Sequence, residues 1–245
     1  MLRRLLITLG LLPSRYLWRN PFKIIEYEEL LDGIDIRPTD AILDIGCGSG
    51  PQDLLLARRA ATVVGIDVSP KEIDRARALA AVYARGLGLE YRCTPLEKAG
   101  FARHQFDKVV SFCVLEHIVN REEVLGVIAN VLKPGGCLVM SVDSLATITD
   151  ARLIAKHKAD HHVQTYFTPL ELRALLEAHG FRDIRIRPIF RSPYARRSFE
   201  AGIDREFQYH RYRKFGALAR LKLDDYRFRH ADRGMFLCAT AVKPA

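Results

Sequence analysis

Short apolar runs alternate along the chain with segments whose apolar residues recur at helical spacing. Apolar runs of this kind, bounded by Gly, Pro, Asp or Ser, are typical of strands buried on both faces of a parallel sheet. A first strand leads into the glycine-rich turn at 46–50, and later strands are predicted at 62–67, 87–93, 109–112, 137–143, 181–189 and 235–242. Helices are predicted at 22–31, 57–60, 70–85, 122–132 and 168–179. The order predicts an α/β domain.

The most informative stretch is residues 41–50, which read Ala-Ile-Leu-Asp-Ile-Gly-Cys-Gly-Ser-Gly. Gly46, Gly48 and Gly50 allow positive φ angles and a close approach of the backbone to a ligand. Open α/β sheets bind ligands at the carboxyl edge, where this loop is predicted. A nicotinamide-type loop would need a third glycine where the chain has Pro51, which disfavours a dehydrogenase.

A second carboxylate follows at the end of the next predicted strand. Asp67 lies 17 residues after Gly50, where dinucleotide folds place an acid that accepts hydrogen bonds from ribose hydroxyls. Val68 is placed to lie against an adenine ring. Ser69 and Pro70 then match the N-cap and first position of a helix.

These stretches, with three others, resemble the class I S-adenosylmethionine-dependent methyltransferases of the quinone and small-molecule branch. The other matches are Phe-Asp-Lys-Val-Val-Ser-Phe-Cys-Val-Leu-Glu-His-Ile at 106–118, Leu-Lys-Pro-Gly-Gly at 132–136 and His-Gly-Phe at 179–181. The resemblance implies a Rossmann-like, seven-stranded, mostly parallel sheet with helices on both faces and an antiparallel last strand. It also implies a helix before the first strand that closes over the cofactor. We predict N-terminal helices at 1–34, which form a lid or a membrane-interfacial segment, and a methyltransferase domain at 35–245 with insertions at about 144–167 and 190–234.

The resemblance implies S-adenosylmethionine as cofactor. In the turn at 94–97, Pro95 has no N–H, so the Leu96 backbone would donate to the adenine ring, and Thr94 or Glu97 would reach its amine. Carbonyls near Phe112 and Cys113 would accept the amino group of the methionine part. The implied cofactor-binding residues are Asp44, Gly46, Cys47, Gly48, Gly50, Asp67, Val68, Thr94, Leu96, Glu97, Phe112 and Cys113.

His117 and Asp143 are the candidate general bases. A near-neutral imidazole at 117 could take a proton from an acceptor hydroxyl, or the residue could instead cap a helix or bind the cofactor through water. Relatives often carry a carboxylate where this chain has Cys113, and Glu116 with His117 makes a poor metal site, so no metal is predicted. The candidate substrate contacts are Tyr27, His161, His162 and Tyr166, the last three in a segment that could form a lid.

The net charge is +9, and residues 182–233 hold 15 Lys and Arg against 7 Asp and Glu. This excess suggests either an anionic partner or a solvated basic face. Residues 1–20 repeat Leu at helical spacing but are too short to span a bilayer; they could lie in a membrane interface or cover the site. Partners would be a small-molecule or lipid-linked acceptor, a membrane surface and a second subunit in a homodimer. A nucleic-acid partner is disfavoured because residues 111–114 read Ser-Phe-Cys-Val, where RNA methyltransferases more often have Asn/Asp-Pro-Pro-Tyr/Phe or Pro-Cys.

Five cysteines without a C-x-x-C pair indicate reduced thiols in a cytoplasmic protein, with peripheral attachment to the inner face of the membrane as the alternative. The predicted reaction is methyl transfer to a hydroxyl oxygen by direct displacement at the sulfonium methyl. Three alternatives remain open: an amine acceptor, an RNA acceptor, or a protein that binds the cofactor without catalysis.

Overall fold

The computed structural model describes residues 20–31, 34–204 and 214–245. The predictions for residues 1–19, and most of the aromatic and basic segment at 207–215, therefore lie outside the described residues. Among the described residues, no helix combines the length and the apolar composition needed to cross a bilayer.

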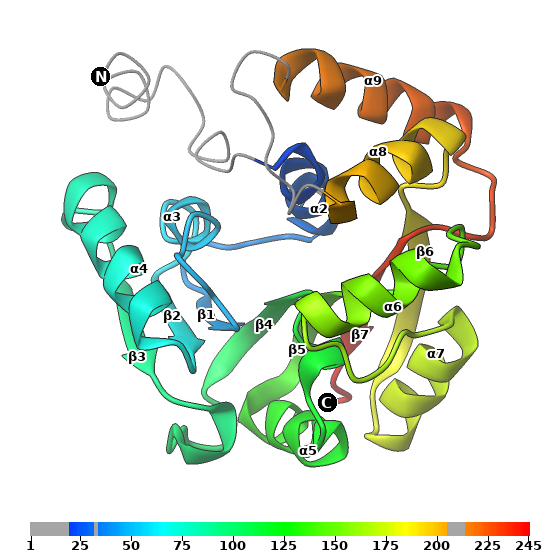
Figure 1. The fold of residues 1–245 in the computed structure, drawn as a ribbon. Coiled ribbons are helices and arrows are strands. Elements are labelled where there is room, and N and C mark those ends of the chain that lie inside the picture. Colours follow the sequence, from blue (N-terminus) through cyan, green and yellow to red (C-terminus); the bar gives the residue numbers. More distant parts are fainter. Residues whose placement is uncertain (1–19, 32–33, 205–213) are drawn as a thin grey trace.

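Seven strands form one sheet in the order β3-β2-β1-β4-β5-β7-β6 (Figure 1). The strands are β1 (Ala41–Ile45), β2 (Thr62–Asp67), β3 (Leu89–Cys93), β4 (Phe106–Phe112), β5 (Leu132–Asp143), β6 (Arg182–Ile189) and β7 (Phe236–Val242). The pairs from β3 to β5 are parallel, whereas β7 runs antiparallel to both β5 and β6. The predicted fold class, with its antiparallel last strand, is confirmed.

The helices cover both faces of the sheet (Figure 1). They are α2 (Pro21–Leu31), α3 (Asp53–Leu56), α4 (Pro70–Tyr83), α5 (Arg121–Val131), α6 (Ala151–Asp160), α7 (Pro169–Ala178), α8 (Pro193–Asp204) and α9 (Lys214–Arg227), with short 3-10 turns η2 (Leu96–Lys98) and η3 (Leu115–His117). The predicted segment at 144–167 contains α6, and the segment at 190–234 contains α8 and α9.

Two local predictions are wrong. The helix expected at 57–60 is instead α3, which begins directly after the glycine loop because Leu54 and Leu56 are buried there. The turn expected at 133–136 lies inside β5: Phe106 pairs with Leu132 and Lys108 with Cys137, so these residues form an irregularity in the ladder. The chain still bends there, since Gly135 has a φ of +75°.

The core consists of two main layers, one on each face of the sheet. On one face, Ile42 and Val110 share a cluster with residues of α2, α8 and α9. On the other face, Leu43, Val109 and Leu138 share a cluster with residues of α5 and α7. Successive strand residues thus point to opposite layers, as the pleat requires, and all loops after the parallel strands meet at one edge.

Candidate functional site

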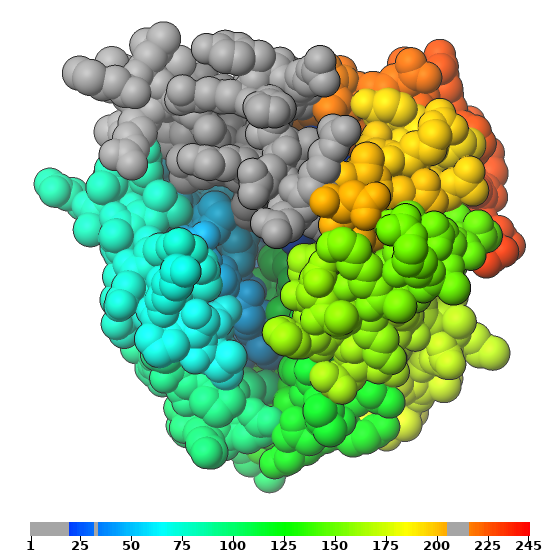
Figure 2. All heavy atoms as spheres, viewed as in Figure 1, coloured from blue at the N-terminus to red at the C-terminus, as the bar shows by residue number. Residues whose placement is uncertain are grey.

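A cavity of about 530 Å³ opens at the carboxyl ends of β1, β2 and β4. It lies where the strand order changes direction, between β1 and β4, which is the usual ligand crevice of such sheets. Figure 2 shows the hollow between the cyan region around α4 and the green region around α6. The predicted residues on its wall are Gly46, Asp67, Val68, Thr94, Leu96, Glu97, Cys113 and His117.

The conformation of the loop at 46–50 requires glycine at positions 46 and 50. Gly46 and Gly50 have φ angles of +70° and +72°, a region that side chains disfavour. A Cβ on Gly46 would lie 2.4 Å from Val114 Cγ2, and one on Gly50 would lie 2.1 Å from Tyr91 Oη. The loop backbone therefore packs between Val114, which follows β4, and Tyr91 of β3.

Two predicted residues lie behind the loop rather than on the cavity wall. Asp44 is fully buried, and Cys47 is 1% exposed. The Gln52 side-chain amide donates to Asp44 Oδ2 at 2.9 Å and to the Cys47 carbonyl at 2.8 Å. Asp44 therefore supports the loop from beneath, and its contact with a cofactor stays a prediction.

Asp67 stands at the end of β2 with both oxygens engaged by backbone. Its Oδ2 accepts from the Gly48 N–H at 2.9 Å, and its Oδ1 accepts from the Ser69 N–H at 2.8 Å. A carboxylate oxygen has lone pairs for more than one donor, so hydroxyl groups can still bind. Val68 beside it is 69% exposed, and its side chain forms part of the wall.

The turn after β3 forms another wall of the cavity. The Thr94 N–H donates to the Asp67 carbonyl at 3.0 Å, which joins the ends of β2 and β3. Glu97 Oε1 accepts from Asn120 Nδ2 at 2.8 Å. This bond ties the turn to the segment that carries His117, so two walls of the cavity are connected.

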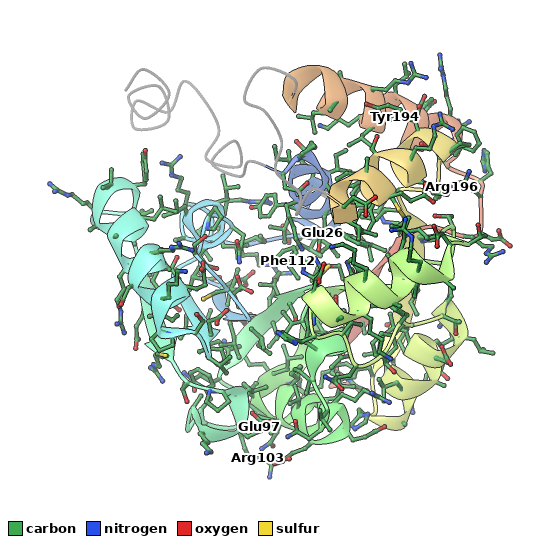
Figure 3. The ribbon with its side chains drawn as sticks, in the orientation of Figure 1. Glu26, Glu97, Arg103, Phe112, Tyr194 and Arg196 are labelled. Carbon is green, nitrogen blue, oxygen red and sulfur yellow. The ribbon has the colours of Figure 1, made fainter. Side chains whose placement is uncertain are left out.

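The loop after β4 turns sharply at Cys113, whose φ is +50°. The Cys113 N–H donates to the Ser141 carbonyl at 3.1 Å and its thiol donates to Glu26 Oε1 at 3.1 Å. Ser141 also donates to Glu26 through its hydroxyl. Figure 3 places Glu26, which belongs to α2, in the interior close to Phe112, and Tyr27 stacks on Phe112 with ring centroids 6.1 Å apart.

His117 lies on the cavity wall, and one of its ring nitrogens has no hydrogen-bond partner in the described part of the chain. Its Nδ1 is buried and has no hydrogen-bond partner among the described residues. Burial lowers the pKa of His117 below its ordinary value of 6.5, and the backbone of His161 and His162 contributes opposing hydrogen bonds. The imidazole is therefore neutral near pH 7, and two predicted substrate residues lie against it.

Asp143 lies behind Cys113 at the end of β5 and is 5% exposed. Burial raises the pKa of Asp143 to about 7, and Glu26 adds to this effect while Lys23 opposes it. Its Oδ2 is 3.8 Å from His157 Nε2, and His157 Nδ1 is 3.0 Å from the Tyr166 hydroxyl. Because burial lowers the pKa of His157 to about 4, the imidazole between Asp143 and Tyr166 is uncharged near neutral pH.

One group of described residues could hold a metal ion: the side-chain donor atoms of Cys113, Glu116 and Asp143 lie within 4.8 Å of one another. Burial raises the pKa of Cys113 and of Glu116 well above their ordinary values. Thiol and carboxyl groups that keep their protons are poor metal ligands. We assign no metal role to this group, and the absence of a metal stays a prediction.

Sequence reasoning missed four residues of the site. Lys23 and Glu26 come from α2, whose charged residues would normally face water, and Gln52 and Asp53 lie beneath the glycine loop. Only the placement of α2 against β5 reveals the first two. For Gln52 and Asp53, the available signal was their position directly after the glycine loop and directly before Leu54, which is buried.

A protein-family model described as a methyltransferase domain matches residues 43–140. The chain is 36% identical over 151 residues to the ubiquinone biosynthesis O-methyltransferase of Dinoroseobacter shibae, covering 58% of this chain and 60% of that protein. It is 31% identical over 193 residues to the protein of the same name from Hahella chejuensis, covering 73% of this chain and 79% of that protein. The match thus spans less than two thirds of the first relative.

Solved structures share the fold. Phosphoethanolamine N-methyltransferase 2 of Haemonchus contortus superposes with a TM-score of 0.64 at 18% identity, over 91% of this chain and 52% of that chain. The [4+2]-cyclase SpnF superposes with a TM-score of 0.65 at 21% identity, over 89% and 80%. At these identities the likeness shows the architecture alone. The names of the two proteins also describe different reactions, N-methyl transfer and [4+2] cyclisation.

Proposed function

The chain belongs to the class I S-adenosylmethionine-dependent methyltransferase family, in the branch that includes the ubiquinone O-methyltransferases, and on this premise we propose that it methylates a hydroxyl oxygen of a small-molecule or lipid-linked acceptor. One observation carries the proposal. The neutral imidazole of His117 lines the same cavity as Gly46 of the glycine loop and Asp67. This shared cavity supports the proposal that a base acts beside the bound cofactor.

The residues present fit the cofactor. The cavity volume of about 530 Å³ lies in the range that small-molecule sites occupy. The backbone of Gly46 lies on the cavity wall, where a ligand can approach it closely, and Asp67 offers a carboxylate for two ribose hydroxyls. The turn at Leu96 and Glu97 would hold the adenine, and the backbone at Phe112 and Cys113 would hold the amino group.

Bound S-adenosylmethionine would supply an electrophilic methyl carbon. On transfer, the acceptor oxygen would bond to that carbon, and the electron pair of the carbon–sulfur bond would stay on sulfur. His117 would take the acceptor proton on its imidazole, which lines the cavity. The protein's larger contribution is to place the acceptor in line with the carbon–sulfur bond and to exclude water. Asp143 is the alternative base, but it lies behind Cys113.

The test is His117→Gln compared with the parent protein in methyl-transfer assays on fractionated acceptors. We expect kcat to fall by about 100-fold or more, the usual scale of a general base, while the dissociation constant for S-adenosylhomocysteine stays within about twofold. Asp143→Asn serves as the matched variant. Equal kcat in parent and His117→Gln would remove His117 from the mechanism, and a large loss only in Asp143→Asn would transfer the role to Asp143.

With labelled methyl on S-adenosylmethionine, the fraction that takes up the label separates the alternatives. Label in lipid or small hydroxyl compounds supports the proposal, label in amines supports N-methylation, and label in RNA supports a nucleic-acid acceptor. Cofactor binding without label in any fraction supports a non-catalytic protein. The homodimer and the division into residues 1–34 and 35–245 are proposals of the same kind, which sedimentation and limited proteolysis would test.

We also propose that the outer face of α9 and the turn after it contact an anionic membrane surface. Leu223, Tyr226 and Phe228 are 48%, 65% and 41% exposed. Arg227 and Arg229 flank them, and the Arg229 guanidinium lies 4.5 Å from the Tyr226 ring centroid. Aromatic and aliphatic groups edged by cations are typical of interfacial helices. Such a contact would make the protein peripheral to a membrane within the cytoplasm.

Vesicle co-sedimentation tests this surface. Leu223→Ser with Tyr226→Ser should weaken binding to phosphatidylglycerol vesicles by about 10-fold, and Leu170→Ser should not, since Leu170 is 77% exposed on α7. Binding that is equal in all three proteins would exclude the α9 face. Binding to RNA but not to vesicles would assign the basic region to nucleic acid instead.

A further inference from the structure

Two carboxyl groups are buried side by side beneath the glycine loop. Asp44 comes from β1 and Asp53 from α3, and both side chains are fully buried. Space for Asp53 exists only because position 65 on β2 is glycine: a Cβ there would lie 2.9 Å from Asp53 Oδ2. The neighbouring strand therefore leaves room for this acid in the interior of the sheet.

The hydrogen bonds of the pair are complete only if a proton is present. With both groups as carboxylates, neither oxygen of Asp53 has a donor, and neither does Asp44 Oδ1. The two carboxyl groups are nevertheless neighbours: Asp44 pairs with Gly65 in the ladder, and a Cβ on Gly65 would lie 2.9 Å from Asp53 Oδ2, and each group changes the pKa of the other. Such a contact is favourable only when one of the two carries a proton, because a carboxylate can only accept.

The surroundings of the pair are acidic or neutral. Asp67 on β2, Cys47 in the loop and Tyr91 on β3 face it, and no Lys, Arg or His among the described residues contributes to the pKa of either acid. Burial raises the pKa of Asp44 to about 7, and burial with the Asp44 charge raises the pKa of Asp53 well above its ordinary range. Two adjacent buried carboxyl groups without a cation cannot both ionise at modest cost.

Each acid is also linked to the backbone of the loop. Gln52 donates to both Asp44 and the Cys47 carbonyl. The Tyr91 hydroxyl donates its one hydrogen to the Gly50 carbonyl at 3.2 Å and lies beside Asp53. The pair of acids therefore adjoins both contacts of the loop, the one from Gln52 at its beginning and the one from Tyr91 at its end.

We propose that Asp44 and Asp53 share one proton and that this proton holds the glycine loop in the conformation that binds the cofactor. Asp53 donates to Asp44 through the shared proton, and Gln52 and Tyr91 connect the pair to the loop. Loss of the proton leaves two adjacent negative charges that repel each other, and the Asp53 carboxylate then competes with the Gly50 carbonyl for the Tyr91 hydrogen. Asp53 is thus a positioning residue, and the identity of the ligand rests on the proposed function.

The first experiment measures binding of S-adenosylhomocysteine to the full chain by calorimetry from pH 6 to pH 9. We expect the dissociation constant of the parent to rise about 10-fold across this range. Asp53→Asn keeps a donor but loses the titrating proton, so its dissociation constant should stay within about twofold. Asp74→Asn, which removes an exposed acid on α4, should behave like the parent. The same pH dependence in Asp53→Asn as in the parent would overturn the proposal.

The second experiment uses no ligand, so it still decides if the chain does not bind S-adenosylhomocysteine and the proposed function fails. A raised pKa in the folded state means that the folded chain keeps a proton that the unfolded chain loses above about pH 4. That excess lowers stability as pH rises, and Asp53→Asn removes it. The Tm advantage of Asp53→Asn over the parent should therefore grow from pH 5 to pH 8.5. A difference independent of pH would overturn the shared proton. Asp44→Asn replaces Asp53→Asn if the latter does not fold.

Discussion

Asp67 shows how one side chain can serve both the loop and the ligand. Its two oxygens accept from the Gly48 and Ser69 N–H groups, and the proposed ribose hydroxyls would share them. Asp67→Ala should therefore weaken S-adenosylhomocysteine binding by about 1–3 kcal/mol, the scale of a lost charged acceptor. Calorimetric dissociation constants test this.

Asp67→Asn separates the two roles. The asparagine carbonyl can still accept from one backbone N–H but has no charge, so we expect a smaller loss of affinity than in Asp67→Ala. Thermal unfolding without ligand shows how much of each loss comes from a loosened loop. Unchanged affinity in both variants would contradict the ribose assignment.

Two glycines give opposite predictions for the same substitution. In Gly50→Ala the new methyl group would lie 2.1 Å from Tyr91 Oη at a φ of +72°. Both overpacking and backbone strain then lower the free energy of unfolding, by about 2–4 kcal/mol. Gly126 lies in α5 with nothing near its Cβ, so Gly126→Ala should raise stability by about 0.5–1 kcal/mol. Urea unfolding measures both, and equal effects would contradict the assignment of Gly50.

At the scale of elements, the sequence predicts those features that depend only on neighbouring residues. The strands around the glycine loop, the N-cap at Ser69 and the capping box at Thr168 follow from short-range rules, and the structure confirms them. The short helix α3 could not be placed, because its position depends on Leu54 and Leu56 entering a core formed by distant strands. The irregular start of β5 depends likewise on its pairing with β4.

The site divides in the same way. Gly46 and Asp67 were predictable, because each stands at a fixed place at the end of a strand. Glu26 was not, since nothing in the helical spacing of 22–31 shows that an acid would face inward. The inward direction follows from α2 packing across β5, where Ser141 and Cys113 both donate to this carboxylate.

The inward charges of α2 make a prediction for the whole element. Lys23 Nζ lies 2.9 Å from Glu26 Oε2, and the side chain of Glu26 is fully buried whereas that of Lys23 is 35% exposed. Lys23→Met leaves a buried carboxylate without its cation. It should lower the free energy of unfolding by about 1–3 kcal/mol, less than for a fully buried pair, because water reaches Lys23.

A double-mutant cycle distinguishes the pair from general packing. Lys23→Met with Glu26→Gln should cost less than the two single variants added together. Arg37→Met is the exposed control, because the Asp35–Arg37 side chains are 78% and 72% exposed and such pairs contribute little. Additive effects in the cycle, or equal losses in Lys23→Met and Arg37→Met, would show that the α2 pair does not stabilise the fold.

For the whole molecule, charge supplies two opposing expectations for stability against pH. The net charge of +9 and the pI of about 9.5 mean that general repulsion decreases as pH rises towards 9.5. The buried acids act in the opposite direction. Burial raises the pKa of Asp44 and Asp143 to about 7, so the folded chain keeps protons that the unfolded chain loses above about pH 4.

Buried histidines complete the balance and fix the pH window of the last prediction. Burial lowers the pKa of His157 to about 4, so between pH 4 and 6.5 the unfolded chain binds the extra proton and stability rises with pH, against the trend of the acids. Above pH 6.5 the histidines no longer contribute, and the acids alone remain. The free energy of unfolding should therefore fall between pH 6.5 and 8.5, with a slope of at most about 1.4 kcal/mol per pH unit for each proton retained. Urea titrations at four pH values measure this, and Asp143→Asn should reduce the slope. A steady rise towards pH 9.5 would instead mean that general repulsion, and not the buried acids, governs the pH dependence of this fold.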